Sequence, residues 1–211
     1  SYFNKGEIIN FTTENGLEDN FVRFIEEDDQ RNIWISTNQG ISVFNLDRLK
    51  IEKKSKFNFS LPHRKVRSLL FDGKTMWIGT DAGLCKWKNN KLEIITTLEG
   101  LSHNQVLCLS KGPNGNIYVG TNKGFNILED GKVIKSFTSE DGLENDRIRA
   151  VVEAGNGLVF LGTRKGIALL NYKKDLIKNI SEENGMSNNR VRTLVIDDHK
   201  NLWIGTYFGG I

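Results

Sequence analysis

One four-residue motif recurs five times along the 211-residue chain at a nearly constant spacing. Each copy has an aromatic residue, an apolar residue, a small residue and a threonine: Trp34-Ile35-Ser36-Thr37, Trp77-Ile78-Gly79-Thr80, Tyr118-Val119-Gly120-Thr121, Phe160-Leu161-Gly162-Thr163 and Trp203-Ile204-Gly205-Thr206. Successive threonines are 43, 41, 42 and 43 residues apart. Such a period indicates a repeat architecture, in which each unit buries its apolar face against its neighbours.

Two further features recur in step with this motif. A glycine and an apolar residue follow each threonine, as Gly40-Ile41, Gly83-Leu84, Gly124-Phe125, Gly166-Ile167 and, with one extra residue, Gly209-Gly210-Ile211. A glycine turn precedes four of the aromatic strands, as Gly16-Leu17, Gly100-Leu101, Gly142-Leu143 and Gly185-Met186. Ser60-Leu61-Pro62 stands there in the second repeat, so we expect that loop to follow a different path.

Each repeat divides into four short β-strands. Val191–Ile196, Leu202–Thr206, Ile167–Asn171 and Leu176–Ile180 are typical strand segments, and no helical period competes with them. The turns between the first and second strands use residues suited to tight turns, as in Asp28–Asn32, Gly112–Asn116 and Asp197–Asn201. Four antiparallel strands in about 42 residues predict the blade of a β-propeller.

The predicted fold is therefore all-β, one β-propeller domain over residues 1–211 with about five four-stranded blades. The expected repeats cover residues 14–58, 59–98, 99–139, 140–182 and 183–211, and residues 3–12 are expected to form an outer strand of a preceding or closing blade. That strand could complete the last blade of a five-bladed ring. We favour a piece of a longer array, because the fifth copy stops inside a strand.

The repeat closely resembles the two-component regulator propeller repeat. The resemblance is carried by Asn189–Leu194, Asp197-Asp198 and Asn201–Thr206, and it recurs in all five copies. It implies a larger, seven-bladed type of propeller in the extracytoplasmic, periplasmic region of a hybrid two-component sensor histidine kinase, as is common in gut Bacteroides. Such sensors detect breakdown products of complex polysaccharides, and their kinase and membrane segments would lie outside this chain.

The basic residues gather in loops that a propeller places on one face. The net charge of +3 and the pI of about 8.8 are mild and do not demand a nucleic-acid partner. However, the residue after the valine or isoleucine of the innermost strand is an arginine in four repeats, namely Arg23, Arg67, Arg149 and Arg192, with Leu107 in the third. We expect these guanidinium groups near the central channel, where they could grip carboxylates or sulfates of an acidic oligosaccharide. The alternative is that each arginine bonds to loop carbonyls or to a neighbouring acid.

Other candidates lie in the same loops. Arg164 and Lys165 add positive charge, and Tyr207 and Phe208 add aromatic rings on which a sugar could stack. A short polar residue follows four positions after each turn glycine, as Asn20, Asn104, Asp146 and Asn189, and we expect it to hold the turn through local backbone bonds. The repeated aromatic residue, from Trp34 to Trp203, is expected in the core between blades.

Catalysis and metal binding find little support in the sequence. Cys85 and Cys108 are in no metal-ligand spacing and are expected to be small buried side chains, so no cofactor or metal is predicted. His63, His103 and His199 occupy unrelated repeat positions, and we expect a non-catalytic fragment, with a propeller lyase or hydrolase as the alternative. The expected partners are an acidic oligosaccharide and neighbouring domains of the parent sensor. A scaffold that forms protein contacts or a homodimer is the competing hypothesis, and no nucleic-acid or direct membrane contact is expected.

Overall fold

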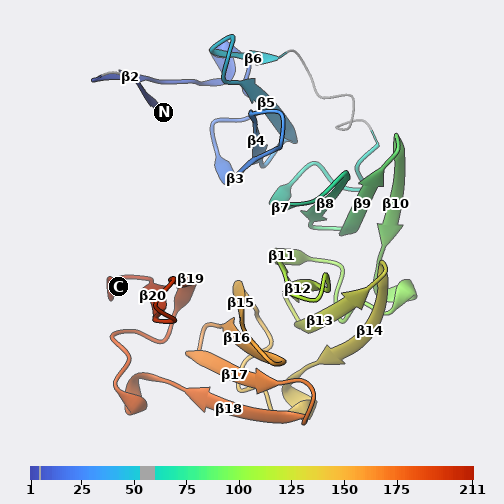
Figure 1. Ribbon diagram of the computed structural model, residues 1–211, viewed down its shortest axis with the longest axis vertical. Helices are drawn as coiled ribbons and strands as arrows, with labels where there is room; N and C mark the ends of the chain where they lie inside the picture. Colours follow the sequence, from blue (N-terminus) through green and yellow to red (C-terminus); the bar gives the residue numbers. More distant parts are fainter. Residues whose placement is uncertain (5, 53–59) are drawn as a thin grey trace.

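The computed structural model describes residues 1–4, 6–52 and 60–211 and is a β-propeller whose blades follow one another around an open arc (Figure 1). Each complete blade is a four-stranded antiparallel sheet with its strands in chain order. The first blade is β3 (Val22–Glu27), β4 (Asn32–Thr37), β5 (Ile41–Asn45) and β6 (Lys50–Glu52); the second is β7 (Val66–Asp72), β8 (Thr75–Thr80), β9 (Gly83–Lys88) and β10 (Lys91–Ile95). The third is β11 (Val106–Lys111), β12 (Ile117–Thr121), β13 (Gly124–Glu129) and β14 (Lys132–Phe137); the fourth is β15 (Ala150–Gly155), β16 (Leu158–Gly162), β17 (Ile167–Asn171) and β18 (Leu176–Ile180).

Two smaller sheets flank the four blades. β19 (Val191–Ile196) and β20 (Leu202–Thr206) form a half-blade, and β1 (Tyr2–Asn4) and β2 (Glu7–Ile9) form a hairpin at the other end of the arc. The expected all-β propeller is thus confirmed, with four complete blades. The expected outer strand over residues 3–12 differs from the structure, because Gly6, with a φ of +90°, turns the chain between two short strands. The expected boundary between the first two repeats, at residues 58 and 59, lies outside the described residues.

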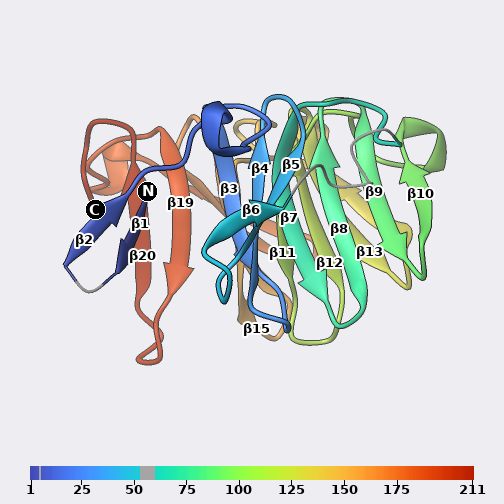
Figure 2. The same ribbon diagram turned by 90° about the horizontal axis from the view of Figure 1, so that it is seen from above.

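The inner strands β3, β7, β11, β15 and β19 line the concave side of the arc, and each contacts the inner strand of the next blade. The side view shows the strands of successive blades running roughly parallel to the axis of the arc (Figure 2). Loops that connect one blade to the next therefore share a face with the turns between the second and third strands. The geometry of the site below depends on this arrangement.

The small residue of the repeated motif makes room for the next blade. A Cβ atom placed on Gly79 would lie 2.7 Å from Cγ1 of Val106, and one placed on Gly162 would lie 2.6 Å from Cγ1 of Val191. Real carbon atoms do not approach so closely. The glycine of one blade and the β-branched residue of the next are therefore one contact, and both recur because the contact between blades recurs.

The threonine of the motif closes the turn that follows it. Its hydroxyl donates to the carbonyl of the glycine three residues later, with distances of 2.8–2.9 Å in the four complete blades: Thr37 to Gly40, Thr80 to Gly83, Thr121 to Gly124 and Thr163 to Gly166. Thr206 donates instead to Gly210, at 3.1 Å, because the fifth copy has one more residue. The motif thus fixes the path of the turn beside the concave face.

The glycine turns contain short 3-10 helices, η1 (Thr13–Asn15), η2 (Thr97–Glu99), η3 (Ser139–Asp141) and η4 (Glu182–Asn184). Each ends at the repeated glycine, whose φ of 96–106° favours a residue without a side chain. The side-chain oxygens of Asn20, Asn104 and Asn189 accept hydrogen bonds from backbone N–H groups of these helices at 2.7–2.8 Å, as expected. Asp146 accepts from the Ser139 hydroxyl instead.

The repeated aromatic residue is buried or half-buried where another blade follows. Trp77 and Tyr118 are 3% and 0% exposed, and the Trp34 ring packs against Phe71 of the second blade at a centroid distance of 5.6 Å. The prediction is wrong for Trp203, which is 52% exposed because no blade packs beyond β20 in the described part of the chain. Cys85 and Cys108 are free thiols, and burial raises the pKa of each to about 12. Over residues 1–4, 6–52 and 60–211, no helix has the length and apolarity needed to cross a membrane.

Candidate functional site

Three of the four expected arginines occupy β-bulges at the same end of the inner strands. The pairing register shifts between Val22 and Phe24, between Val66 and Ser68, and between Val191 and Thr193, which leaves Arg23, Arg67 and Arg192 outside the regular alternation. Leu107 has this place in the third blade. Arg149 precedes β15, and its N–H donates to the Gly162 carbonyl at 2.8 Å. Because a bulge re-aims a side chain, these residues leave the sheet and reach the loops on one face.

The residue after the motif threonine is Asn38, Asp81, Asn122, Arg164 and Tyr207 in successive copies. In the first, second and fifth copies this residue contacts the arginine at the bulge of the inner strand. The Arg23 Nε donates to Oδ1 of Asn38 at 2.8 Å, and the guanidinium of Arg192 lies 4.4 Å from the ring centroid of Tyr207. Each blade therefore presents a pair of side chains on the same face, as the sequence predicts for these two loops.

In the second blade this pair is a self-contained ion pair. Nε of Arg67 bonds to Oδ1 of Asp81, and a second guanidinium nitrogen bonds to Oδ2 at 3.2 Å. The two side chains are 12% and 15% exposed, and Nζ of Lys65 lies 3.7 Å from the same carboxylate. Burial alone would raise the pKa of Asp81, but the hydrogen bonds and charge of Arg67, with the charge of Lys65, outweigh burial and hold that pKa below its usual range.

Positive charge gathers on the fourth blade and the half-blade. We call Arg147, Arg149, Arg164 and Arg192, from the fourth blade and the half-blade, the arginine cluster. Burial, together with the charges of Arg147, Arg192, Arg164 and Arg67, lowers the pKa of Arg149 to about 10. None of the four forms an ion pair with a residue that the structure describes. Nε of Arg147 is buried without a hydrogen-bond partner in that part of the chain.

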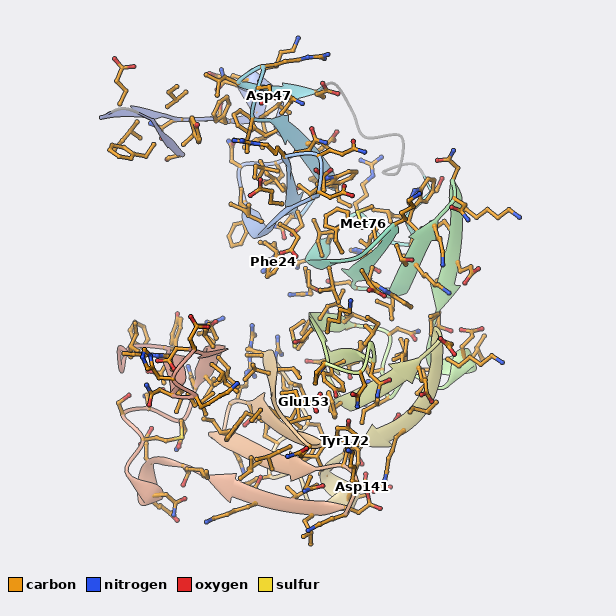
Figure 3. All side chains as sticks on the ribbon, viewed as in Figure 1. Phe24, Asp47, Met76, Asp141, Glu153 and Tyr172 are labelled. Atoms are coloured by element: carbon orange, nitrogen blue, oxygen red, sulfur yellow. The ribbon has the colours of Figure 1, made fainter. Side chains whose placement is uncertain are left out.

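The concave face is thus less symmetric than a ring of equivalent arginines. Arg23 is held by Asn38 and lies 4.6 Å from the ring centroid of Phe21, and Arg67 is neutralised by Asp81. The remaining predicted arginines join the cluster on the fourth blade and the half-blade. Figure 3 shows Phe24 on this same concave side, at the inner strand of the first blade. The arginines of the first two blades therefore have polar or charged partners, whereas those of the arginine cluster have no carboxylate partner among the described residues.

The other predicted site residues fall in two places. Tyr207 contacts the bulge residue Arg192, and Arg164 takes the equivalent position in the fourth blade, so both are kept in the candidate site. Tyr207 is 37% exposed, and its ring centroid lies 4.2 Å from that of Phe208. Lys165 lies apart, in a surface hollow of about 320 Å³ lined also by residues such as Glu144 and Asn179. Arg147 lies among the basic residues that the sequence places in these loops, but it was not singled out as a site residue. Its place directly before the repeated isoleucine is the signal that could have found it.

The histidines are engaged in loop structure. Nδ1 of His63 accepts from the Lys65 N–H at 3.0 Å, and Nδ1 of His103 accepts from the Gln105 N–H at 2.9 Å. His199 lies in the turn between β19 and β20, at the opposite end of its strand from Arg192. Among the described residues, no group of three or more His, Cys, Asp or Glu side chains could hold a metal ion.

Comparison with known proteins gives one family match. The model of the two component regulator propeller family matches residues 16–39, 100–123 and 185–208, which are the glycine turns and aromatic strands of the first, third and fifth repeats. A search of curated protein sequences found no match.

Several solved structures share the fold. The extracellular domain of a putative hybrid two component system from B. thetaiotaomicron has a TM-score of 0.82 at 24% identity, over 97% of this chain and 29% of that one. PorZ, a surface component of the type-IX secretion system of Porphyromonas gingivalis, has a TM-score of 0.76 at 13% identity, over 99% and 34%. Virginiamycin B lyase from Staphylococcus aureus has a TM-score of 0.65 at 16% identity, over 87% and 62%. This chain therefore spans about a third or less of the first two, and the model of the two component regulator propeller family matches three of its five repeats.

Proposed function

We propose that this chain is part of the periplasmic sensor region of a hybrid two-component histidine kinase and binds an acidic oligosaccharide on its concave face without chemical turnover. Two findings support the sensor role: the three matches to the two component regulator propeller family, and the fold shared with the extracellular domain of a putative hybrid two component system. The ligand class is supported by the arginine cluster, whose four guanidinium groups have no carboxylate partner among the described residues.

The chemistry of the concave face suits a saccharide that carries acidic groups. Guanidinium forks bind carboxylates and sulfates through paired hydrogen bonds. Tyr207 offers a partly exposed ring beside Arg192, and a sugar ring can stack on such a surface while its acidic substituent meets the guanidinium. A neutral ligand would leave the positive charges of the cluster without compensation.

The same geometry supports binding in preference to catalysis. The described histidines serve turns or lie at the opposite end of the strand from the cluster, and one acid on this face, Asp81, is occupied by Arg67. A glycosidase or lyase needs a base or an acid pair free to meet the substrate. The shared fold of virginiamycin B lyase therefore supports the architecture only.

A scaffold role is the second candidate, and the two ends of the arc favour it. The first blade exposes Phe21 and Ile25, each 57% exposed, and the half-blade exposes Val195 and Trp203, 55% and 52% exposed. Large apolar side chains gathered in this way are typical of surfaces that contact another protein or another domain. A neighbouring blade of the parent protein or a second copy of the chain would cover them.

A thermal-shift screen tests the ligand hypothesis. The chain is heated with oligogalacturonate, with chondroitin sulfate oligosaccharide and with neutral cello-oligosaccharide, each at two salt concentrations. We expect stabilisation by the acidic sugars only, reduced at high salt, because binding to the folded state raises the melting temperature and salt screens the guanidinium groups. The scaffold role would be favoured if neither acidic sugar changes the melting temperature and sedimentation shows association that rises with protein concentration.

A further inference from the structure

We infer that the arginine cluster is a binding site for one oxyanion, a carboxylate or a sulfate ester of the ligand, held between the fourth blade and the half-blade. The inference rests on the proposed function, because it names the chemical group that the concave face recognises and the residues that hold it. Arg149 and Arg164 of the fourth blade and Arg192 of the half-blade would contact the oxyanion, with Arg147 behind them.

The first observation is a comparison of equivalent positions in successive blades. The bulge residue and the residue that faces it are Arg23 and Asn38 in the first blade, Arg67 and Asp81 in the second, and Leu107 and Asn122 in the third. These pairs are complementary or neutral. In the fourth blade the same two positions hold Arg149 and Arg164, which are like charges, where the second blade places a carboxylate opposite its arginine.

The second observation is that two arginines of the cluster are partly removed from water. Arg149 and Arg147 are partly buried, and burial is the main cause of the lowered pKa of each guanidinium. Bringing several cations together in a partly buried place is unfavourable unless an anion compensates them. Nε of Arg147, buried and without a partner among the described residues, is a further donor that nothing in its surroundings satisfies.

The third observation concerns the wall of the site. Tyr207 takes the facing position in the half-blade, and its ring stacks beside the Arg192 guanidinium without accepting its hydrogen bonds. The N–H donors of Arg192 thus stay available to a ligand, while the aromatic ring orients the group that carries them. An oxyanion with two or three oxygens can accept from Arg149, Arg164 and Arg192 together, whereas a hydroxyl cannot.

The test uses the full 211-residue chain and arginine-to-glutamine substitutions, which remove the charge and keep much of the side-chain length. Arg164→Gln is the principal variant, because Arg164 is exposed in a turn and its loss should leave the fold intact. Arg149→Gln is the second. Arg48→Gln is the matched control, because Arg48 pairs with Glu52 on the outer side of the first blade, at 3.1 Å. Calorimetric titration is carried out with inorganic sulfate, oligogalacturonate and chondroitin sulfate oligosaccharide.

We expect Arg164→Gln and Arg149→Gln each to weaken binding by about tenfold or more, since each removes a charge-assisted contact. Arg48→Gln should bind like the unmodified chain. Without ligand, Arg164→Gln should raise the melting temperature by roughly 1–3 °C, because it relieves repulsion between like charges. If Arg164 had only a structural role, its replacement would lower the melting temperature instead.

The outcomes separate this inference from the proposed function. Binding that survives both substitutions but is lost in Arg67→Gln overturns the oxyanion site at the cluster and keeps the acidic ligand. Sulfate binding that depends on Arg149 and Arg164, with no saccharide binding, supports the site and contradicts the oligosaccharide. If sulfate and both acidic sugars all fail to bind the folded chain, the inference and the proposed ligand are both wrong.

Discussion

The guanidinium of Arg67 grips both oxygens of the Asp81 carboxylate, joining the bulge of β7 to the turn after β8. Because both side chains are largely buried, removing the carboxylate leaves an uncompensated cation. We expect Asp81→Asn to lower the free energy of unfolding by about 2 kcal/mol and the melting temperature by roughly 4–8 °C. Asp175→Asn is the control, because Asp175 pairs with Lys135 at an exposed site and should change stability little. Equal melting temperatures for the two variants would contradict the prediction.

Low pH should remove the stabilisation that the ionised Asp81 gives to the folded chain. Its pKa in the folded chain lies below the unfolded value of about 3.9, so the unfolded chain binds more protons as the pH falls. The stabilisation is therefore complete above about pH 5 and is lost as the pH falls below about 4. Urea unfolding at a series of pH values measures the free energy of unfolding of the unmodified chain and of Asp81→Asn. The difference between the two free energies should shrink as the pH falls below about 4. A difference in free energy of unfolding that stays constant down to pH 3.5 would falsify the lowered pKa of Asp81.

A partly buried hydrogen bond links the third and fourth blades. The hydroxyl of Tyr118, on β12, donates to Oε2 of Glu153, on β15, and lies 3.4 Å from the Tyr172 hydroxyl; Figure 3 labels Glu153 and Tyr172 between these blades. Tyr118→Phe removes the donor to a carboxylate and should cost about 1–2 kcal/mol, measured as a lower urea midpoint at unchanged slope. Tyr172→Phe keeps the bond to Glu153, so it should cost less than half as much. A larger loss from Tyr172→Phe would rule out this bond as the stabilising contact.

One carboxylate holds the turn between β3 and β4. Asp28 accepts from Nε1 of Trp34 at 2.8 Å, from Nδ2 of Asn32 at 3.0 Å, and from two backbone N–H groups. We expect Asp28→Ala to cost about 2 kcal/mol, because four donors lose their acceptor. Asp29→Ala, at the exposed neighbouring position, should stay within about 0.5 kcal/mol of the unmodified chain. Thermal unfolding of both variants tests the pair, and comparable losses would count against the hydrogen-bonded turn.

Much of the fold could be predicted from the repeat. The expected strands Val191–Ile196, Leu202–Thr206, Ile167–Asn171 and Leu176–Ile180 agree with β19, β20, β17 and β18 at both ends, because turn residues bound each strand. The N-terminal segment was harder to predict. A three-residue strand offers too little alternation to recognise, and only the glycine marks its turn.

The candidate site could be predicted only in part. The repeat identified the positions of Arg23, Arg67, Arg149 and Arg192, but treated them as equivalent. Which arginine has a partner depends on the residue after the threonine, and that residue faces the arginine only because a bulge shifts the register. A shift of one residue is not visible in strand periodicity, so the asymmetry between Arg67 and Arg149 required the structure.

The residues at the bulges are separate from the residues that hold the blades together. A residue at a bulge is outside the ladder of pairs that sets the register, so its replacement leaves the glycine–valine contacts between blades and the threonine turns untouched. Each blade can therefore exchange the two side chains it displays while keeping the same scaffold. The four blades and the half-blade present such pairs as Arg and Asn, Arg and Asp, Leu and Asn, Arg and Arg, and Arg and Tyr. In such an array, substitutions at these two positions can change the charge and shape of the concave face while the strand register and the contacts between blades stay the same.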